Sequence, residues 1–168
     1  MKKGLKIFTL VVACATLLLG LGITVPVIYD DIQFNRYAGA VVDEMKQGGI
    51  STVQLKKDIG ILFGNGNHLD MEVLAFIKTT LSPKELAAYL SASKIESPFD
   101  RSNHFSLYKV DPSGVSVYFV GTNSWEKPEG LETREQEAIA GVHSDFDYVV
   151  SYVDQAYDGF SMYDYRAN

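Results

Sequence analysis

Residues 7–29 read IFTLVVACATLLLGLGITVPVIY, 23 consecutive positions without a charged side chain. As an α-helix this stretch would extend about 34 Å at ~1.5 Å per residue, which is enough to cross a hydrocarbon layer of ~30 Å. The stretch decides the architecture, because the rest of the chain must then fold outside that layer.

Three interpretations compete for this stretch: an uncleaved anchor, a cleaved secretory signal, or a lipoprotein signal in which Cys14, the single cysteine, takes a lipid. A secretory signal needs an apolar region of only ~7–15 residues. Cleavage beside Ala13-Cys14-Ala15 would leave a mostly apolar segment at the new N-terminus, and a lipoprotein signal has the same difficulty. We therefore favour a transmembrane helix over residues 7–29 that acts as a signal anchor, with lipidation of Cys14 or N-terminal cleavage as the alternatives.

The charges that flank the span predict its orientation. Three lysines precede it and two aspartates follow it: Lys2, Lys3, Lys6, Asp30 and Asp31. Positive charge is retained on the cytoplasmic side of membranes. We expect a single-pass protein with a short cytoplasmic N-terminus, residues 1–6, and an extracytoplasmic C-terminal part.

Small residues recur every four positions within the span, at Thr16, Gly20 and Thr24. Such a spacing places them on one helix face and lets two membrane helices approach closely. The pattern predicts weak self-association through this face. The alternative is that small residues are simply common in membrane spans.

The chain after residue 29 is acidic. It carries 21 acidic and 12 basic residues, a formal net charge of −9, and the excess is concentrated after residue 110. Nucleic-acid affinity depends on Lys and Arg that neutralise phosphates, so this charge argues against nucleic-acid binding. A single cysteine also excludes an intramolecular disulfide and a cysteine-based zinc cluster.

Residues 30–49 have the pattern of a juxtamembrane amphipathic helix. Its apolar positions recur at helical spacing with polar residues between them: Phe34, Tyr37, Ala38, Val41, Val42 and Met45. Gly48-Gly49 would end this helix as a C-terminal cap. We expect the apolar stripe to pack on the following domain, residues 50–168, with contact to the lipid surface as the alternative.

Local signals predict a hairpin and a helix at the start of this domain. Residues 53–63 and 69–78 alternate apolar and polar side chains and flank the turn sequence Gly64-Asn65-Gly66-Asn67, which favours a β-hairpin. Ser82 can cap the helix that follows, Pro83 suits its first turn, and Glu85 completes a capping box.

A second hairpin is predicted from HFSLYKV, residues 104–110, and VSVYFVG, residues 115–121, joined by the turn sequence DPSG. A long connection over residues 122–144, with one or two helical turns in it, then leads to a last strand over residues 146–154. The fold class is therefore α+β: an N-terminal transmembrane helix, then a small antiparallel sheet of about five strands with one or two packed helices.

Two short motifs are the candidates for catalysis or metal binding. His68 and Asp70, and likewise His143 and Asp145, are two residues apart, so each pair shares a face of a strand. If folding joined the pairs, the four side chains could hold a metal or act as acid and base. The competing interpretation is that both motifs are solvated residues next to turns.

Trp125 is the candidate binding residue, because a loop-borne tryptophan often anchors a partner. Its ring could equally cover the sheet. No GxSxG, HExxH, Walker or GxGxxG pattern occurs, so we expect no cofactor. The sequence favours a bacterial-type membrane-anchored binding or accessory protein without catalysis; the alternative is an envelope-located hydrolase or metal-dependent enzyme that uses the His/Asp cluster.

Overall fold

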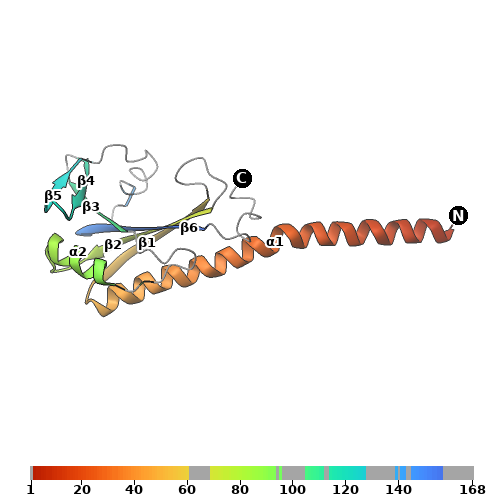
Figure 1. Ribbon diagram of the computed structural model, residues 1–168, viewed down its shortest axis with the longest axis horizontal. Helices are drawn as coiled ribbons and strands as arrows, with labels where there is room; N and C mark the ends of the chain where they lie inside the picture. The colour runs from red at the N-terminus through yellow and green to blue at the C-terminus, as the bar shows by residue number, and fades with distance from the viewer. Residues whose placement is uncertain are drawn as a thin grey trace.

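The computed structural model has one long N-terminal helix, a six-stranded antiparallel sheet and a second helix (Figure 1). The prediction of an α+β fold with an N-terminal helix is confirmed. The structure describes residues 2–60, 69–93, 95, 105–111, 114–127, 139, 141–142 and 145–156.

Helix α1 runs without interruption over Lys2–Gln47 and includes both the predicted span and the predicted juxtamembrane helix. It is long and apolar enough to cross a membrane. Its end is a Schellman motif: the amide of Ile50 donates to the carbonyl of Met45 at 2.9 Å, and that of Gly49 donates to Lys46 at 3.1 Å. Gly49 adopts φ +69°, the left-handed conformation that this motif requires. The predicted C-terminal cap is confirmed.

All six strands belong to one sheet in the order β1-β2-β6-β3-β4-β5, with every neighbouring pair antiparallel. Their bounds are β1 Ser51–Gly60, β2 Leu69–Lys78, β3 Phe105–Asp111, β4 Gly114–Phe119, β5 Ser124–Glu126 and β6 Tyr148–Ala156. The two predicted hairpin pairings, β1 with β2 and β3 with β4, are confirmed. The turn at 64–67 lies outside the described residues, as do Pro112, Ser113 and most of the connection from 128 to 144.

Strand β5 is the element that the sequence did not predict. Its three residues are too few to show an alternating pattern, so the sequence predicts only a long connection there. In the fold they pair with the end of β4, with Trp125 opposite Tyr118. The sheet therefore has six strands instead of about five.

Helix α2, Pro83–Ala92, begins as its sequence predicts. The Ser82 hydroxyl accepts from the Glu85 amide, and the Glu85 carboxylate accepts from the Ser82 amide at 2.9 Å. These reciprocal bonds form the predicted capping box. They satisfy two amides that would otherwise lack partners at the helix start.

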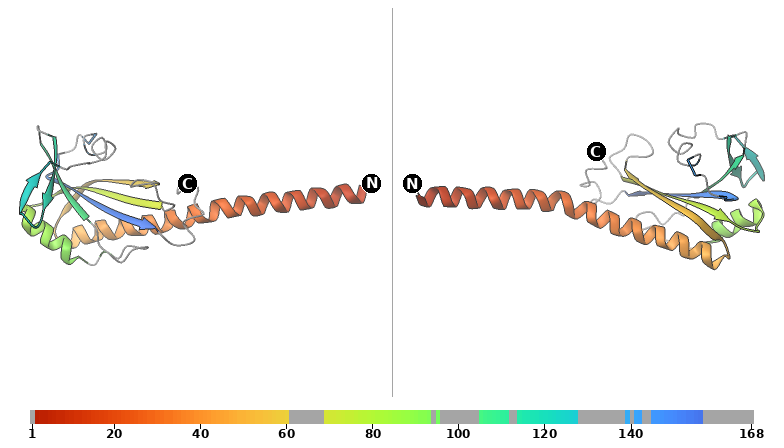
Figure 2. Two further views of the ribbon diagram at one scale, coloured as in Figure 1. Left: turned by 45° about the horizontal axis from the view of Figure 1, so that its top comes forward. Right: turned by 180° about the vertical axis from the view of Figure 1, so that it is seen from behind.

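The sheet is covered on both faces. On one face, α1 and α2 pack over alternate residues of the central strands, and the two helices lie on the same side of the sheet in Figure 1. On the other face, Ile139 and Val142 pack with Leu74, Phe76 and Val149. Consequently β2 is buried from Asp70 to Ile77, and the N-terminal half of α1 extends alone beyond the domain (Figure 2).

Candidate functional site

The junction between the apolar span and the domain lies within α1. Side chains from Lys6 to Val25 are exposed, and a buried stripe begins at Pro26. The stripe continues through Asp30 and Phe34, with exposed fractions of 0% and 5%, to Met45. One continuous helix thus joins the membrane-spanning candidate directly to the core of the domain.

The four His/Asp candidates do not form one group through their described members. Asp70 is fully buried at the start of β2. Asp145 is exposed and forms an ion pair with Lys78, the last residue of β2. Eight residues of extended strand span about 26 Å, far more than a metal or acid–base site allows. His68 and His143 lie outside the described residues.

The ion pair of Asp145 has an ordinary structural explanation. The Asp145 carboxylate accepts a hydrogen bond from Lys78 and thereby raises the pKa of that lysine. Nearby, the Asp147 carboxylate accepts from the Thr79 amide at 2.9 Å, so both aspartates hold the turn after β2. Within the described ranges, no group of three or more His, Cys, Asp or Glu residues could hold a metal ion.

Several buried polar residues were not expected from the sequence. Glu72 is 6% exposed, and its carboxylate accepts a 2.8 Å hydrogen bond from the buried Ser151 hydroxyl. Asp154 is buried on the helix side, where burial of the Tyr37 hydroxyl, and after it the charge of Asp154, raises the pKa of Tyr37. The even positions of β2 resemble a solvent face at Asp70 and Glu72, but Leu74 and Phe76 on that face were a signal that it is covered.

Trp125, the candidate binding residue, is half-buried between two tyrosines. Its ring is stacked on Tyr148 with centroids 5.9 Å apart and an interplanar angle of 7°, and it lies 5.2 Å from the Tyr118 ring. The hydroxyl of Tyr118 donates to Asn123 in the adjoining turn. The indole therefore supports the β4–β5 hairpin, while its exposed part borders the surface.

Exposed apolar side chains lie next to Trp125. Phe119 and Val120 are 45% and 59% exposed at the end of β4. Apart from the α1 helix, the only other large apolar side chain with this exposure in the described part of the chain is Val53 on β1. We call Phe119, Val120 and Trp125 the hairpin tip. The sequence did not reveal it, because VSVYFVG alternates like any core strand.

Thr16, Gly20 and Thr24 lie on the exposed surface of α1, as a contact face requires. Each threonine hydroxyl donates to the carbonyl four residues earlier at 2.9 Å, at Val12 and Gly20, so its donor hydrogen is already bonded within the helix. A Cβ on Gly20 would meet no atom within 4 Å. The self-association of this face stays a prediction.

The fold and its junction define an α+β domain built directly on the end of a long apolar helix. No protein-family model, curated protein or solved structure matches this chain.

Proposed function

We propose that this protein is a single-pass membrane protein whose C-terminal domain binds the extracytoplasmic part of another membrane protein, without catalysis. Residues 7–29 are the proposed span, Lys2, Lys3 and Lys6 stay on the cytoplasmic side, and the domain is extracytoplasmic. The partner contacts the domain at the hairpin tip.

The observation that carries this proposal is the continuity of α1. Val41 and Met45, both fully buried, belong to the same helix as the exposed apolar residues of the span. Burying an apolar side chain stabilises a fold by about 1.5–3 kcal/mol. The domain cannot leave the membrane helix without losing several such side chains from its core, so its binding surface is held at a fixed place relative to the bilayer.

The side chains of the hairpin tip favour it as the place where the partner binds. Aromatic residues are enriched in protein interfaces, and tryptophan and tyrosine supply much of their binding energy. At the tip, an exposed Phe119 and Val120 adjoin a rigid aromatic stack. The tip also lies at the end of the domain away from the span (Figure 1), where it can reach a second membrane protein's extracytoplasmic part.

A photo-crosslinking experiment tests this proposal with the full chain in intact cells. A photoreactive phenylalanine analogue replaces Val120, and the matched control carries it at Val53, which is 43% exposed on β1. We expect one discrete adduct with another membrane protein from position 120 and none from position 53. Equal adducts from both positions, or none from position 120, would contradict a partner at the hairpin tip.

Orientation is tested separately by cysteine labelling. Thr122→Cys in a Cys14→Ser background places one exposed thiol beside the hairpin tip. A maleimide that cannot cross membranes should label this thiol in intact cells. Labelling only after the cells are lysed would show that the domain faces the cytoplasm.

A further inference from the structure

The exposed apolar surface of α1 ends at a different residue on each side of the helix. On the side that faces the sheet, burial begins at Pro26 and includes the charged Asp30. On the opposite side, Ile28 and Ile32 remain 57% and 47% exposed, in line with the span. The apolar surface therefore extends about 9 Å further on the side away from the sheet, at ~1.5 Å per residue.

This offset fits a tilted helix. The exposed apolar surface from Ile7 to Ile32 would be about 39 Å long, against a hydrocarbon layer of ~30 Å. Membrane helices accommodate such an excess by tilting, commonly by about 20° and by up to about 40°. A tilt toward the side of Ile28 and Ile32 would place the longer apolar surface deeper in the bilayer.

The shape of α1 favours the same direction. Pro26 lacks an amide hydrogen, and its ring presses on the preceding turn, so a helix bends away from the side that carries a proline. Pro26 is the first buried residue of the stripe that continues to Phe34, which packs against the sheet. Figure 1 shows α1 bending between its free N-terminal half and the part beside the sheet, with the sheet on the convex side. The bend therefore inclines the opposite side of the helix, including Ile32, toward the bilayer surface.

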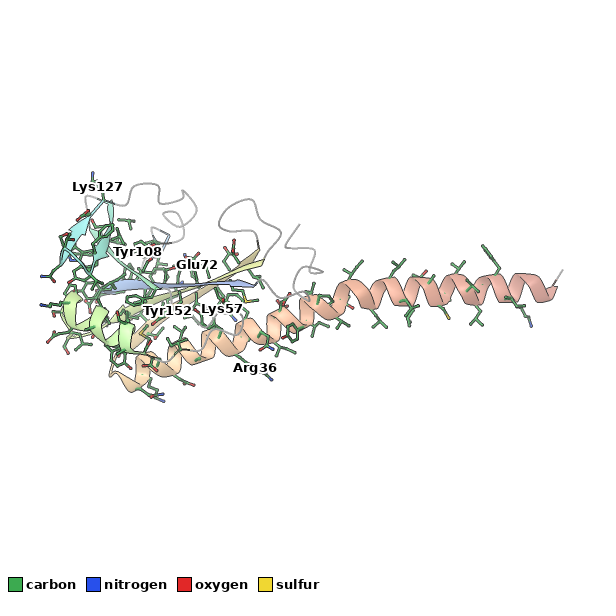
Figure 3. The ribbon with its side chains drawn as sticks, viewed as in Figure 1. Arg36, Lys57, Glu72, Tyr108, Lys127 and Tyr152 are labelled. Carbon is green, nitrogen blue, oxygen red and sulfur yellow. The ribbon has the colours of Figure 1, made fainter. Side chains whose placement is uncertain are left out.

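Basic side chains follow the apolar surface at the height of the lipid headgroups. Arg36 is one turn beyond Ile32 on the same side and is exposed, pointing away from the sheet in Figure 3. The four residues from Ile32 to Arg36 correspond to about 6 Å along the helix, close to the thickness of a headgroup layer. Lys57 of β1 reaches this part of α1, where it donates a 2.5 Å hydrogen bond to Asn35.

The described acidic residues of this part of α1 are less exposed than Arg36 or lie further along the helix. Asp30 is buried toward the sheet and Asp31 is half-buried. Asp43 is exposed on the same side as Arg36, but about 10 Å further along the helix axis. Among the described residues of α1, Arg36 is thus the first exposed charged side chain after the apolar span.

We propose that Ile28 and Ile32 lie at the outer edge of the hydrocarbon layer with Arg36 in the headgroup region, and that Arg36 and Lys57 bind the phosphates of anionic lipids. This interaction rests on the proposed membrane anchor but not on a protein partner. Each basic residue near an anionic surface adds attraction, and arginine pairs with phosphate oxygens through two parallel hydrogen bonds. The domain would then have a defined tilt above the membrane.

Spin-label accessibility measures this contact in the full chain, reconstituted in vesicles of phosphatidylcholine with or without phosphatidylglycerol. In a Cys14→Ser background, single labels are placed by Ile32→Cys and, as the matched control on the same side, by Asp43→Cys. We expect the label at position 32 to be accessible to oxygen and protected from a water-soluble nickel complex. The label at position 43 should be accessible to the nickel complex in both lipids.

The anionic-lipid part of the proposal has its own comparison. We expect phosphatidylglycerol to lower the nickel accessibility at position 32 at least twofold, and the double change Arg36→Gln with Lys57→Gln to abolish that effect. Lys46→Gln, an exposed charge further from the span, should leave it unchanged. The same accessibility in both lipids would overturn the assignment of these two residues to lipid phosphate.

Failure of the inference is distinguishable from failure of the anchor. A label on the native Cys14 reports the span itself. If Cys14 is in lipid while position 32 is as accessible to nickel as position 43, only the contact proposed here is overturned. If Cys14 is accessible to nickel, the membrane anchor fails as well.

Discussion

Replacing Gly48 by alanine should destabilise the domain through one identifiable contact. Gly48 follows α1, and a Cβ built on it would lie 2.6 Å from the ring of Tyr89 in α2. Two carbon atoms cannot approach so closely, so the ring has to move. The Tyr89 hydroxyl donates to the Glu44 carbonyl at 2.7 Å, and this hydrogen bond would be lost with the movement.

The expected magnitude follows from three contributions. The lost hydrogen bond costs about 1 kcal/mol. Displacing a half-buried ring from the junction of the two helices costs on the order of 1 kcal/mol more. Restricting the unfolded chain by a Gly→Ala change returns about 0.4–1 kcal/mol. In the chain that keeps Tyr89, we expect Gly48→Ala to lower the free energy of unfolding by about 1 kcal/mol.

A double-mutant cycle identifies the contact. In a Tyr89→Ala background no ring opposes the new methyl group, so Gly48→Ala should become neutral or slightly stabilising. Trp125 is the single tryptophan, so its fluorescence during denaturant unfolding of the full chain in detergent micelles reports the domain. An equal loss of stability with and without the Tyr89 ring would refute the packing of α2 on the end of α1.

Two further changes test other parts of the domain. Ser82→Ala removes the cap of α2 and should cost about 1 kcal/mol in the same unfolding assay, against less than about 0.5 kcal/mol for the exposed control Ala88→Ser. The hydrogen bonds from Ser82 lower the pKa of Glu85, so their stabilising effect is present at neutral pH and lost as pH falls through that lowered pKa. In Ser82→Ala, the Glu85 pKa measured by NMR should rise toward its ordinary value. An unchanged pKa would contradict the capping box. Ser151→Ala removes the donor to the buried Glu72 carboxylate and should lower the free energy of unfolding by about 1.5–3 kcal/mol. The control Ser116→Ala, at a partly exposed position, should change it little. Equal effects of the two serine changes would contradict this buried hydrogen bond.

Much of the fold could be predicted because its signals are local. The capping box of α2 and the Gly48-Gly49 end of α1 each depend on a few neighbouring residues, and the alternation in β2 and β6 reflects two faces of a strand. The prediction was incomplete where the signal is not local. Strand β5 forms only because Trp125 can pair with Tyr118 across the hairpin, and three residues carry no periodicity.

The candidate site was harder to predict, because it depends on distance in space. His68-Leu69-Asp70 and His143-Ser144-Asp145 resemble each other in sequence, yet Asp70 and Asp145 lie at opposite ends of β2. No property of either motif reveals that separation before the strand order is known. Likewise, two adjacent carboxylates after the span suggest only the end of the membrane segment. In the structure, Asp30 is buried against the domain while the helix continues.

The most direct test of the account is the distance between a spin label on the native Cys14, in the span, and one on Gly39→Cys, in the part of α1 beside the domain. Gly39 is exposed and a Cβ there meets no atom within 4 Å, so the substitution leaves the packing intact. A continuous helix predicts one narrow distribution near about 37 Å for these 25 residues in reconstituted vesicles. A broad distribution, or a mean well below about 30 Å, would show a hinge between span and domain and would contradict the single rigid helix.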